Sequence, residues 1–299
     1  MGNPKAARTV SRGRVYTING QSLWSVTTII GNGLPKPAIA GWQAKTIAEY
    51  AVANHRQLAG MLSAVRLQRG ADGQLDGLVV SDLDAVKAAV EWLKGAPWRE
   101  SERKMNLGSA VHAEAEAVQL GTPRPEPPLT VKRFVESFDH FLEDFSPEIE
   151  MTEATVYNLA ENYAGTLDTI MTFRWGELSV RLLGDFKTGK GIYPDVALQL
   201  AAYEHAESVL LDDGTSVPML PVDGAFALHL REYDPAFPAD RGYSFIPVTT
   251  GQAAWDAFRY VREVMRWMED TSKHVLSQPI TNPEALAFLF PAAVEKGAA

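Results

Sequence analysis

A change of hydrophobic period near the middle of the chain is the sequence feature that most restricts its fold. In residues 131–145, apolar residues recur at helical spacing, which indicates an amphipathic helix that Thr130 can cap. The runs 153–160, 163–174 and 177–188 are instead rich in β-branched and aromatic residues and are joined by short polar turns. Short turns between successive strands favour antiparallel pairing. We therefore expect an α+β protein built on an antiparallel meander.

Further helices and strands are predicted on both sides of this meander. Asn19-Gly20 tolerates the positive φ angles of a tight turn, and the alternating residues around it indicate a β-hairpin. Ser81 followed by Asp84 resembles a capping box. The remaining expected elements are helices at 38–68 (one or two), 81–94, 101–120, 194–211 and 253–270, a loop at Gly70, Gly73 and Gly77, and strands at 224–232 and 243–249.

The order of these elements predicts an α+β sandwich in which one mixed sheet is flanked by helices. At 299 residues, of which 46% are hydrophobic, the chain can bury a sizeable core. We expect an N-terminal hairpin and mostly helical lobe over 1–100, the core over 101–275, and a C-terminal tail over 276–299.

The charge of the chain limits how it could grip nucleic acid. The formal net charge is −9, and neutralisation of phosphates by Lys and Arg is the sequence-independent part of DNA binding, so a broadly basic surface is not expected. The first 14 residues nevertheless carry Lys5, Arg8, Arg12 and Arg14 without an acid. The net charge therefore does not exclude a basic groove on one side of an otherwise acidic protein.

Cysteine content and hydropathy exclude several classes of protein. The absence of cysteine rules out disulfides, thiolate zinc sites and Cys-ligated iron–sulfur clusters, and it fits a reducing cytoplasm. No apolar run approaches the ~18 residues of a membrane-spanning helix, and the basic N-terminus is not followed by the apolar core of a signal peptide. We expect a cytoplasmic protein without a membrane segment.

The stretch GDFKTGKG, residues 184–191, fits two kinds of site. A P-loop would need Ser or Thr after Lys190, but Gly191 stands there, and Asp185 would put a negative charge into the phosphate cradle. Taken as D-x-K at the end of a strand, the same residues place Asp185 and Lys187 on one strand face. This second interpretation is favoured, and a nucleotide-hydrolysing site built on Lys190 remains an alternative.

A partner for Asp185 lies on the preceding predicted strand. Asp168 and Asp185 flank the Trp175-Gly176 turn at spacings that bring both carboxylates to the open end of one hairpin. Phosphodiester hydrolysis needs an activated water and charge compensation, and divalent cations bound to carboxylates provide both. Lys187 could place or polarise that water. Taken alone, an acid and a lysine two residues apart favour a solvent-exposed strand face, but here the pair follows an apolar stretch, where exposed charge is less expected.

Two helical segments could complete such a site. His112 follows Gly108 by one helical turn, and Glu116 follows His112 by another. A neutral imidazole among carboxylates is a reasonable additional metal ligand. Gln199 and Tyr203 form a polar pair one turn apart on an otherwise apolar helix. Each of these features, taken alone, is also explained by ordinary packing or solvation.

Four short motifs occur in the order of a known enzyme family. The set GSAVH, GTLD, GDFKTGK and QLAAY, spanning residues 108–203, resembles the RecB-like branch of the PD-(D/E)xK nuclease superfamily. The RecB-like branch also includes the CRISPR-associated exonucleases. The stretch 25–51 is similar to exonucleases of this branch that are carried by actinobacterial phages. The resemblance implies a restriction-endonuclease-like core. It also implies a bacterial host cytoplasm if the chain is phage-encoded, and a role in DNA recombination, replication or defence.

The resemblance implies roles for particular residues. His112, Asp168 and Asp185 would ligate one or two Mg²⁺ or Mn²⁺ ions together with the backbone carbonyl of Phe186. Lys187 would orient the attacking water and stabilise the transition state. The supporting residues would be Gln199 and Tyr203, which contact DNA or brace the site, the basic Lys190, Glu153 at an acidic position found in parts of the family, and Glu116, either behind the metal ligands or solvated.

The chain departs from several relatives in one respect. They carry four cysteines that hold an iron–sulfur cluster, and this chain has none, so no such cluster is expected. Ordinary packing would have to hold the N-terminal lobe, with Trp24, Trp42 and Trp92 as plausible contributors.

The expected function is that of a divalent-metal-dependent DNA exonuclease acting on a strand end. Trp98, beside Arg99, Arg103 and Lys104, is a candidate for stacking on a single strand, although a buried tryptophan with solvated neighbours is the favoured explanation. A non-catalytic DNA-binding module on the same fold and a structure-specific DNA endonuclease remain alternatives. Assembly into a homo-oligomer also stays open.

Overall fold

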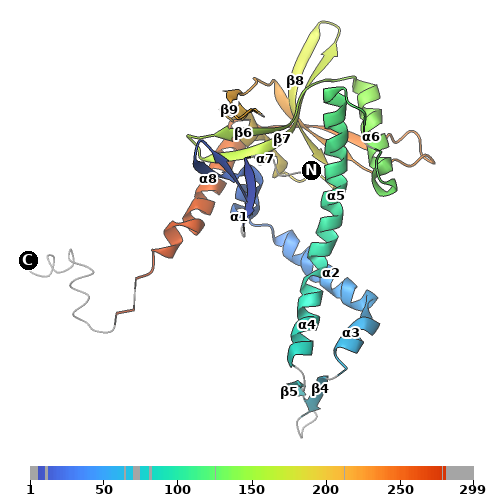
Figure 1. Ribbon diagram of the computed structural model, residues 1–299, viewed down its shortest axis with the longest axis vertical. Helices are drawn as coiled ribbons and strands as arrows, with labels where there is room; N and C mark the ends of the chain where they lie inside the picture. The colour runs from blue at the N-terminus through green and yellow to red at the C-terminus, as the bar shows by residue number, and fades with distance from the viewer. Residues whose placement is uncertain are drawn as a thin grey trace, which may run out of the picture.

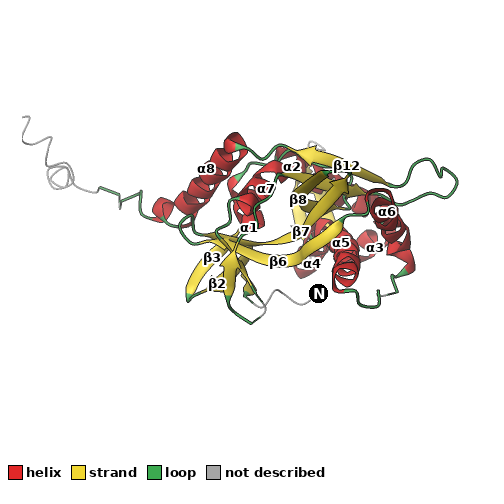
Figure 2. Ribbon diagram, turned by 90° about the horizontal axis from the view of Figure 1, so that it is seen from above, coloured by secondary structure: helices red, strands yellow, loops and turns green. Residues whose placement is uncertain are grey.

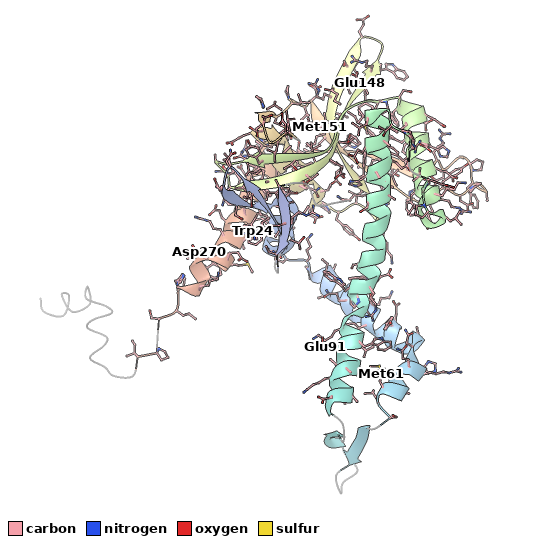
Figure 3. All side chains as sticks on the ribbon, in the orientation of Figure 1. Trp24, Met61, Glu91, Glu148, Met151 and Asp270 are labelled. Carbon is pink, nitrogen blue, oxygen red and sulfur yellow. The ribbon has the colours of Figure 1, made fainter. Side chains whose placement is uncertain are left out.

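The computed structural model describes residues 6–10, 13–63, 65–69, 75–80, 83–124, 126–211, 213–277 and 279–280. The chain forms a body of sheet and helices, and an elongated lobe made mainly of helices extends from it (Figure 1). Met61 and Glu91 lie in this lobe, far from Glu148 and Met151 on the central sheet (Figure 3).

Ten strands of the described chain form one mixed, mostly antiparallel sheet. At its centre, β6 (Glu148–Asn158), β7 (Tyr163–Trp175) and β8 (Leu178–Lys187) pair antiparallel as the predicted meander. β11 (Gly224–Leu230) pairs in parallel with β8, and β12 (Tyr243–Val248) pairs antiparallel with β11. The other strands are β1 (Ala7–Val10), β2 (Gly13–Ile18), β3 (Gln21–Ser25), β9 (Ser208–Leu210) and β10 (Ser216–Pro218). The expected α+β class is thus confirmed.

The N-terminal hairpin belongs to this sheet and not to the helical lobe. β2 and β3 pair antiparallel with Ile18 opposite Gln21, and the turn residues Asn19 and Gly20 have φ angles of 50° and 78°. These are the positive values that the sequence predicts for this turn. β3 also pairs in parallel with the start of β7. The N-terminus is therefore held beside the central meander.

Helices cover both faces of the sheet. α1 (Val26–Gly33), α7 (Val196–Glu204) and α8 (Gln252–Glu269) pack on one face, and α5 (Ala96–Leu120) and α6 (Leu129–Phe145) pack on the other (Figure 2). A short 3₁₀-helix, η1 (Thr271–Lys273), follows α8. Among the described helices, none has the length and apolar character needed to cross a membrane.

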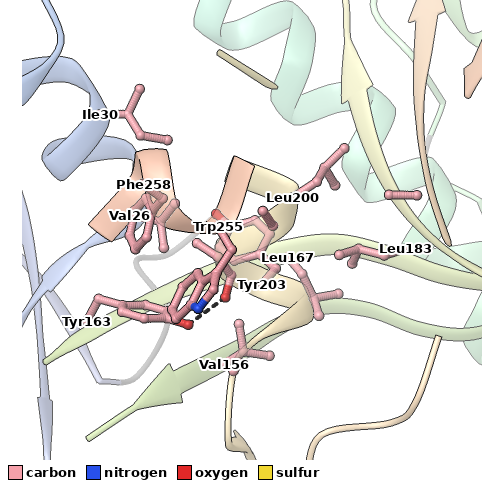
Figure 4. Packing of buried hydrophobic residues seen from close by; sticks show 14 of the residues in the cluster. Val26, Ile30, Val156, Tyr163, Leu167, Leu183, Leu200, Tyr203, Trp255 and Phe258 are labelled. Carbon is pink, nitrogen blue, oxygen red and sulfur yellow. Dashed lines mark hydrogen bonds between the residues drawn. The ribbon is translucent and has the colours of Figure 1, made fainter. Parts of the chain in front are cut away.

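Each face of the sheet buries an apolar cluster. Under α8, the ring of Tyr163 packs edge-to-face on Phe258 at 5.1 Å between centres, and its hydroxyl donates to the carbonyl of Ala202 at 2.7 Å (Figure 4). Under α6, Phe138 and Phe141 of the predicted apolar stripe are fully buried. Burial of one such side chain contributes roughly 1.5–3 kcal/mol. The strands that carry the candidate site are therefore held from both sides.

Two helix ends differ from the sequence prediction. α7 ends at Glu204 and not near Leu211, because residues 208–210 form β9 and pair with the edge of β6. α6 begins at Leu129 with Pro128 as its N-cap, so Thr130 lies in the first turn and does not cap the helix. The φ angle of proline, −53° here, suits the entry to a helix and moves its start by one residue.

The helical lobe consists of α2 (Pro37–Ala53), α3 (His55–Met61), α4 (Leu83–Lys94) and the first turns of α5. Its tip is an antiparallel hairpin of β4 (Val65–Arg69) and β5 (Leu75–Val80), where the sequence predicted a helix end and a loop. Apolar, β-branched residues in both segments favour this pairing over a loop. Gly77 lies in β5 opposite Gln68, whereas Gly70, Gly73 and the predicted cap Ser81 lie outside the described residues.

Aromatic packing joins the helices of the lobe. The rings of Tyr50 in α2 and Trp92 in α4 lie 4.8 Å apart, and the guanidinium of Arg99 in α5 lies 4.7 Å from the centre of the Tyr50 ring. Arg99 also donates to the carbonyl of Trp92 at 2.8 Å. Trp92 thus contributes to the packing of the lobe as expected.

Candidate metal centre

Two aspartates lie side by side where β7 and β8 meet. Thr169 pairs with Gly184, so the next residues along the two strands, Asp168 and Asp185, lie at one level of the sheet. Asp185 is only 1% exposed. The backbone amide of Phe186 donates to Asp168 Oδ2 at 2.7 Å. The two carboxylates that the sequence placed on one hairpin are therefore brought together.

Small residues make this arrangement sterically feasible. A side chain at Gly184 would collide with Phe226 of β11 and Thr169 of β7, so glycine lets these side chains pack closely over β8 directly before Asp185. A side chain at Gly165 would collide with the ring of Tyr203. Tyr203 is buried against β7 and forms a wall of the site.

A histidine and a glutamate extend the pair of aspartates. α5 carries His112, whose Nδ1 hydrogen-bonds to Glu153 of β6 and whose Nε2 lies 3.6 Å from Asp168 Oδ2. One ligand atom from each of His112, Glu153 and Asp168 can be chosen so that all three lie within 4.8 Å of one another. This trio contains Glu153 where the sequence-based set of metal ligands had Asp185.

The backbone at Glu153 is unusual for a strand. Its φ angle is +48°, in the left-handed region that non-glycine residues rarely adopt. Thr152 and Ala154 on either side pair normally with β7, so the distortion is confined to one residue. Such a conformation costs about 1–3 kcal/mol and tends to occur at functional sites. It turns the Glu153 carboxylate toward His112.

Asp185 is held from two directions. Gln199 of α7 donates its side-chain amide to Asp185 Oδ1 at 2.7 Å. The ammonium of Lys187, two residues along β8, forms an ion pair with Asp185 Oδ2. Because alternate residues of a strand share a face, the D-x-K spacing brings acid and ammonium together as predicted. Gln199 therefore fixes the carboxylate that in turn positions the lysine.

Burial and mutual charge perturb the ionisable groups of the site. Burial raises the pKa of Asp185 to about 6, and the charge of Asp168 adds to the rise while Lys187 opposes it. Burial also raises the pKa of Asp168 against the attraction of His112 and Lys187. Burial lowers the pKa of His112, but the charge of Asp168 and the hydrogen bond to Glu153 outweigh it and raise the pKa to about 9. Buried carboxylates of this kind need positive charge beside them.

These groups line one pocket of about 380 Å³. Its further wall comes from the N-terminal hairpin and the start of α1, through Arg14, Tyr16, Ser25 and Thr27. The hydroxyl groups of Tyr16 and Thr166 are hydrogen-bonded at 2.8 Å. Sequence reasoning missed this wall, because only the parallel pairing of β3 with β7 brings it to the site. The available signals were the acid-free basic run that includes Arg14 and the family resemblance of residues 25–51, which include Ser25 and Thr27.

The structure separates some predicted site residues from the pocket. Glu116 is exposed and does not line it. Lys190 is also exposed and lines neighbouring pockets. Phe186 takes part through its amide and through its ring, which meets His112 edge-on at 5.6 Å. Trp98 is 73% exposed, so the interpretation of a buried tryptophan is wrong.

The donor set fits a hard divalent cation. His112, Glu153 and Asp168 offer one imidazole nitrogen and two carboxylate oxygens, with Asp185 beside them. Mg²⁺ prefers oxygen ligands, and Mn²⁺ accepts oxygen together with imidazole. The chain contains no cysteine, so an iron–sulfur cluster of the cysteine-ligated kind is excluded.

No protein-family model matches the chain, and no curated protein matches it. The chemistry of the site must therefore be argued from its own geometry.

Proposed function

We propose that the chain is a divalent-metal-dependent DNA exonuclease of the PD-(D/E)xK type, with a restriction-endonuclease-like core. The observation that carries the proposal is the convergence of His112, Glu153, Asp168, Asp185 and Lys187 in one pocket. The order of elements supports it, since the meander bears the acids, α5 supplies the histidine, and α7 follows the lysine. The partner would be a DNA end, in the bacterial cytoplasm.

Each residue has a defined task in this proposal. His112, Glu153 and Asp168 would hold Mg²⁺ or Mn²⁺, with Asp185 at its side. The bound cation would lower the pKa of a water molecule and offset the charge of the scissile phosphate. Lys187, fixed by Asp185, would donate a hydrogen bond to the attacking water or to a phosphate oxygen. Attack on phosphorus breaks the bond to the leaving oxygen, which takes a proton from solvent.

The ion pair between Lys187 and Asp185 supports catalysis over simple DNA binding. A protein that only grips phosphates gains from exposed cations, whereas this lysine is partly buried beside a carboxylate that attenuates its charge. The arrangement also speaks against the nucleotide-hydrolysing alternative. Lys190 is exposed, and α7 starts only at Val196, so the glycine-rich turn does not lead directly into a helix.

The proposal is tested by cleavage of end-labelled DNA in Mg²⁺ or Mn²⁺. We expect Asp185→Asn and Lys187→Met to lower the rate at least about a hundred-fold, because each removes a group that acts on the reacting atoms or their cation. Glu116→Gln is the matched control, since it removes an exposed acid four residues from His112 and should leave the rate unchanged.

The remaining alternatives give different outcomes in the same assay. Wild type that binds DNA but degrades none with either metal would be a binding module, and the proposal would be wrong. Cleavage of circular single-stranded DNA would identify an endonuclease, because an exonuclease requires an end.

A further inference from the structure

A chain of pockets leads from the candidate metal centre to the helical lobe. The site pocket shares Lys187 and Gln199 with a second pocket, which also contains Lys36 and Tyr193. A third pocket, of about 560 Å³, contains Lys36 and Tyr193 and reaches Trp42. The last, of about 580 Å³, runs from Trp42 to Tyr50 in the lobe. Neighbouring pockets of this series share lining residues, and the series is here called the lobe groove.

Aromatic rings are spaced along the lobe groove. Tyr193, in the loop before α7, is 67% exposed and lines the second pocket, next to the site pocket. Trp42 and Tyr50 of α2 are half-buried and line its further part. Rings with an accessible face bind the faces of unpaired bases, and this stacking does not depend on base identity.

Basic residues accompany the rings. The cations lining the three pockets beyond the site outnumber the carboxylates there, although the whole chain carries a net charge of −9. Two of the acids are already paired, Asp195 with Lys36 at 2.7 Å and Glu49 with Lys45 at 3.6 Å. The exposed Lys190 lines both larger pockets. Each of these pairs also neutralises a cation, so the attraction of the groove for a polyanion comes mainly from the exposed Lys190.

The helix that lines the groove has the surface of a partner-binding element. α2 reads PAIAGWQAKTIAEYAVA, and although most of its residues are apolar, none of its side chains is buried. It is tied to the rest of the protein at its start, where Lys36 contacts Asp195 beside α7, and it crosses α5 within the lobe (Figure 1). Tyr50 packs on Trp92 within the lobe, but no residue of α2 is fully buried, so the helix keeps accessible apolar surface along the groove that a bound ligand could cover.

We propose that the lobe groove binds the terminal nucleotides of a single DNA strand and guides them into the metal centre. The proposal rests on the proposed function and adds to it the strandedness of the substrate and the residues that select it. Tyr193 and Trp42 stack on successive bases, and Lys190 contacts the backbone. Stacked base pairs of a duplex cover their own faces, so a duplex cannot use these rings without fraying.

Binding in the presence of a chelator tests the groove without relying on cleavage. The probe is a fluorescent oligothymidylate, and its affinity is measured by anisotropy. We expect Tyr193→Ala and Trp42→Ala each to weaken binding at least about five-fold, the usual minimum for removing one stacking ring. Tyr193→Phe and Trp42→Phe should retain most of the affinity. Trp175→Ala, which removes an 85% exposed ring at the tip of the β7–β8 hairpin, is the control and should bind as wild type does.

Three results would overturn the groove assignment: alanine variants that bind like wild type, a control variant weakened as much as they are, or a blunt duplex bound as tightly as the single strand. Thermal unfolding checks that the variants fold, and if Trp42→Ala does not, the loop variant Tyr193→Ala decides alone.

Hydrolysis of bis(p-nitrophenyl) phosphate separates this proposal from the proposed function. This small diester needs the metal centre but not the groove, so its hydrolysis by wild type with Mn²⁺ reports on the metal centre alone. Wild type that binds oligothymidylate through the groove but hydrolyses neither substrate would refute the nuclease and leave the groove standing. Hydrolysis of the small diester without groove-dependent binding of oligothymidylate would support the metal-dependent hydrolase and refute the groove assignment.

Discussion

Glu153 has an unfavourable backbone conformation, but this conformation brings its carboxylate to the candidate metal site. At a φ of +48° its carboxylate reaches His112, and with Asp168 these residues form the trio suited to a cation. An L-residue in the left-handed region costs roughly 1–2 kcal/mol, a cost that glycine avoids. Stability and chemistry therefore favour different residues at this position.

Substitutions of Glu153 separate the effect of its backbone conformation on stability from the role of its carboxylate in cleavage. Glu153→Gly and Glu153→Ala both remove the carboxylate, so both should lose metal-dependent cleavage. We expect the glycine variant to be more stable than the alanine variant by about 1 kcal/mol, because only glycine accepts the positive φ without strain. Urea unfolding with a chelator present measures the difference. Equal stabilities would mean that residue 153 does not hold this conformation in solution.

The candidate site was predictable to the extent that it depends on local spacing. Asp168, Asp185 and Lys187 follow from counting along one hairpin, since strand period and turn length fix which side chains meet. Glu153 could have been found by the same counting across the β6–β7 turn, yet only the family resemblance suggested it. Its left-handed backbone could not be foreseen, because nothing local in glutamate favours that conformation.

At the scale of elements, a polar ladder ties the three meander strands together. Arg181 of β8 donates its Nε to both oxygens of Glu150 in β6, at 2.9 and 3.1 Å, and Thr172 of β7 lies between them and also donates to Glu150. The hydrogen bond from Arg181 is the main reason that the pKa of Glu150 lies below its usual value. The ladder therefore stabilises the part of the meander between the candidate site and the β7–β8 turn while Glu150 is ionised.

This ladder should make part of the stability depend on pH. Because the folded pKa of Glu150 is lowered, the unfolded chain binds the proton more tightly, and the contribution is complete above the ordinary carboxyl pKa of about 4.5. It is lost as pH falls through the folded pKa. Glu150→Gln should lower the free energy of unfolding at neutral pH by up to about 1 kcal/mol.

The difference between wild type and Glu150→Gln should shrink as the pH is lowered below about 4. Denaturant unfolding over a pH series measures it. Glu148→Gln is the control, because that carboxylate is 61% exposed and its pair with Arg174 should contribute less. A wild-type advantage that stays constant into acid would contradict an ionised Glu150.

Elements with a strong period were predictable, and elements that exist through distant pairing were not. The stripe of α6 and the alternation of β6 to β8 each specify their structure locally. β9 forms because its three residues complete the edge of β6, and the β4–β5 hairpin lies where glycines suggested a loop. The parallel pairing of β3 with β7 joins segments over a hundred residues apart, which no short-range pattern encodes.

For the whole molecule, the acidic net charge and the proposed DNA substrate have to be reconciled. A chain with a net charge of −9 repels DNA over most of its surface, so affinity must come from a few local contacts. Such binding should depend less on salt than the binding of a broadly basic protein, because fewer counterions are released from the phosphates. Stacking of bases on aromatic rings would supply the part of the affinity that salt does not screen.

Salt titration distinguishes these two parts of the affinity. For a single strand, each phosphate contact contributes about 0.7 to the slope of log affinity against log salt concentration. Lys190→Gln should therefore reduce the magnitude of the slope by about 0.7, whereas Trp42→Ala should weaken binding at every salt concentration and leave the slope unchanged. Lys132→Gln, which removes an exposed lysine of α6 outside the groove, should alter neither the slope nor the affinity. Anisotropy over a range of NaCl concentrations with a chelator present gives all four slopes. Equal changes of slope for Lys190→Gln and Trp42→Ala would mean that charge and stacking do not act as separate contacts along the groove.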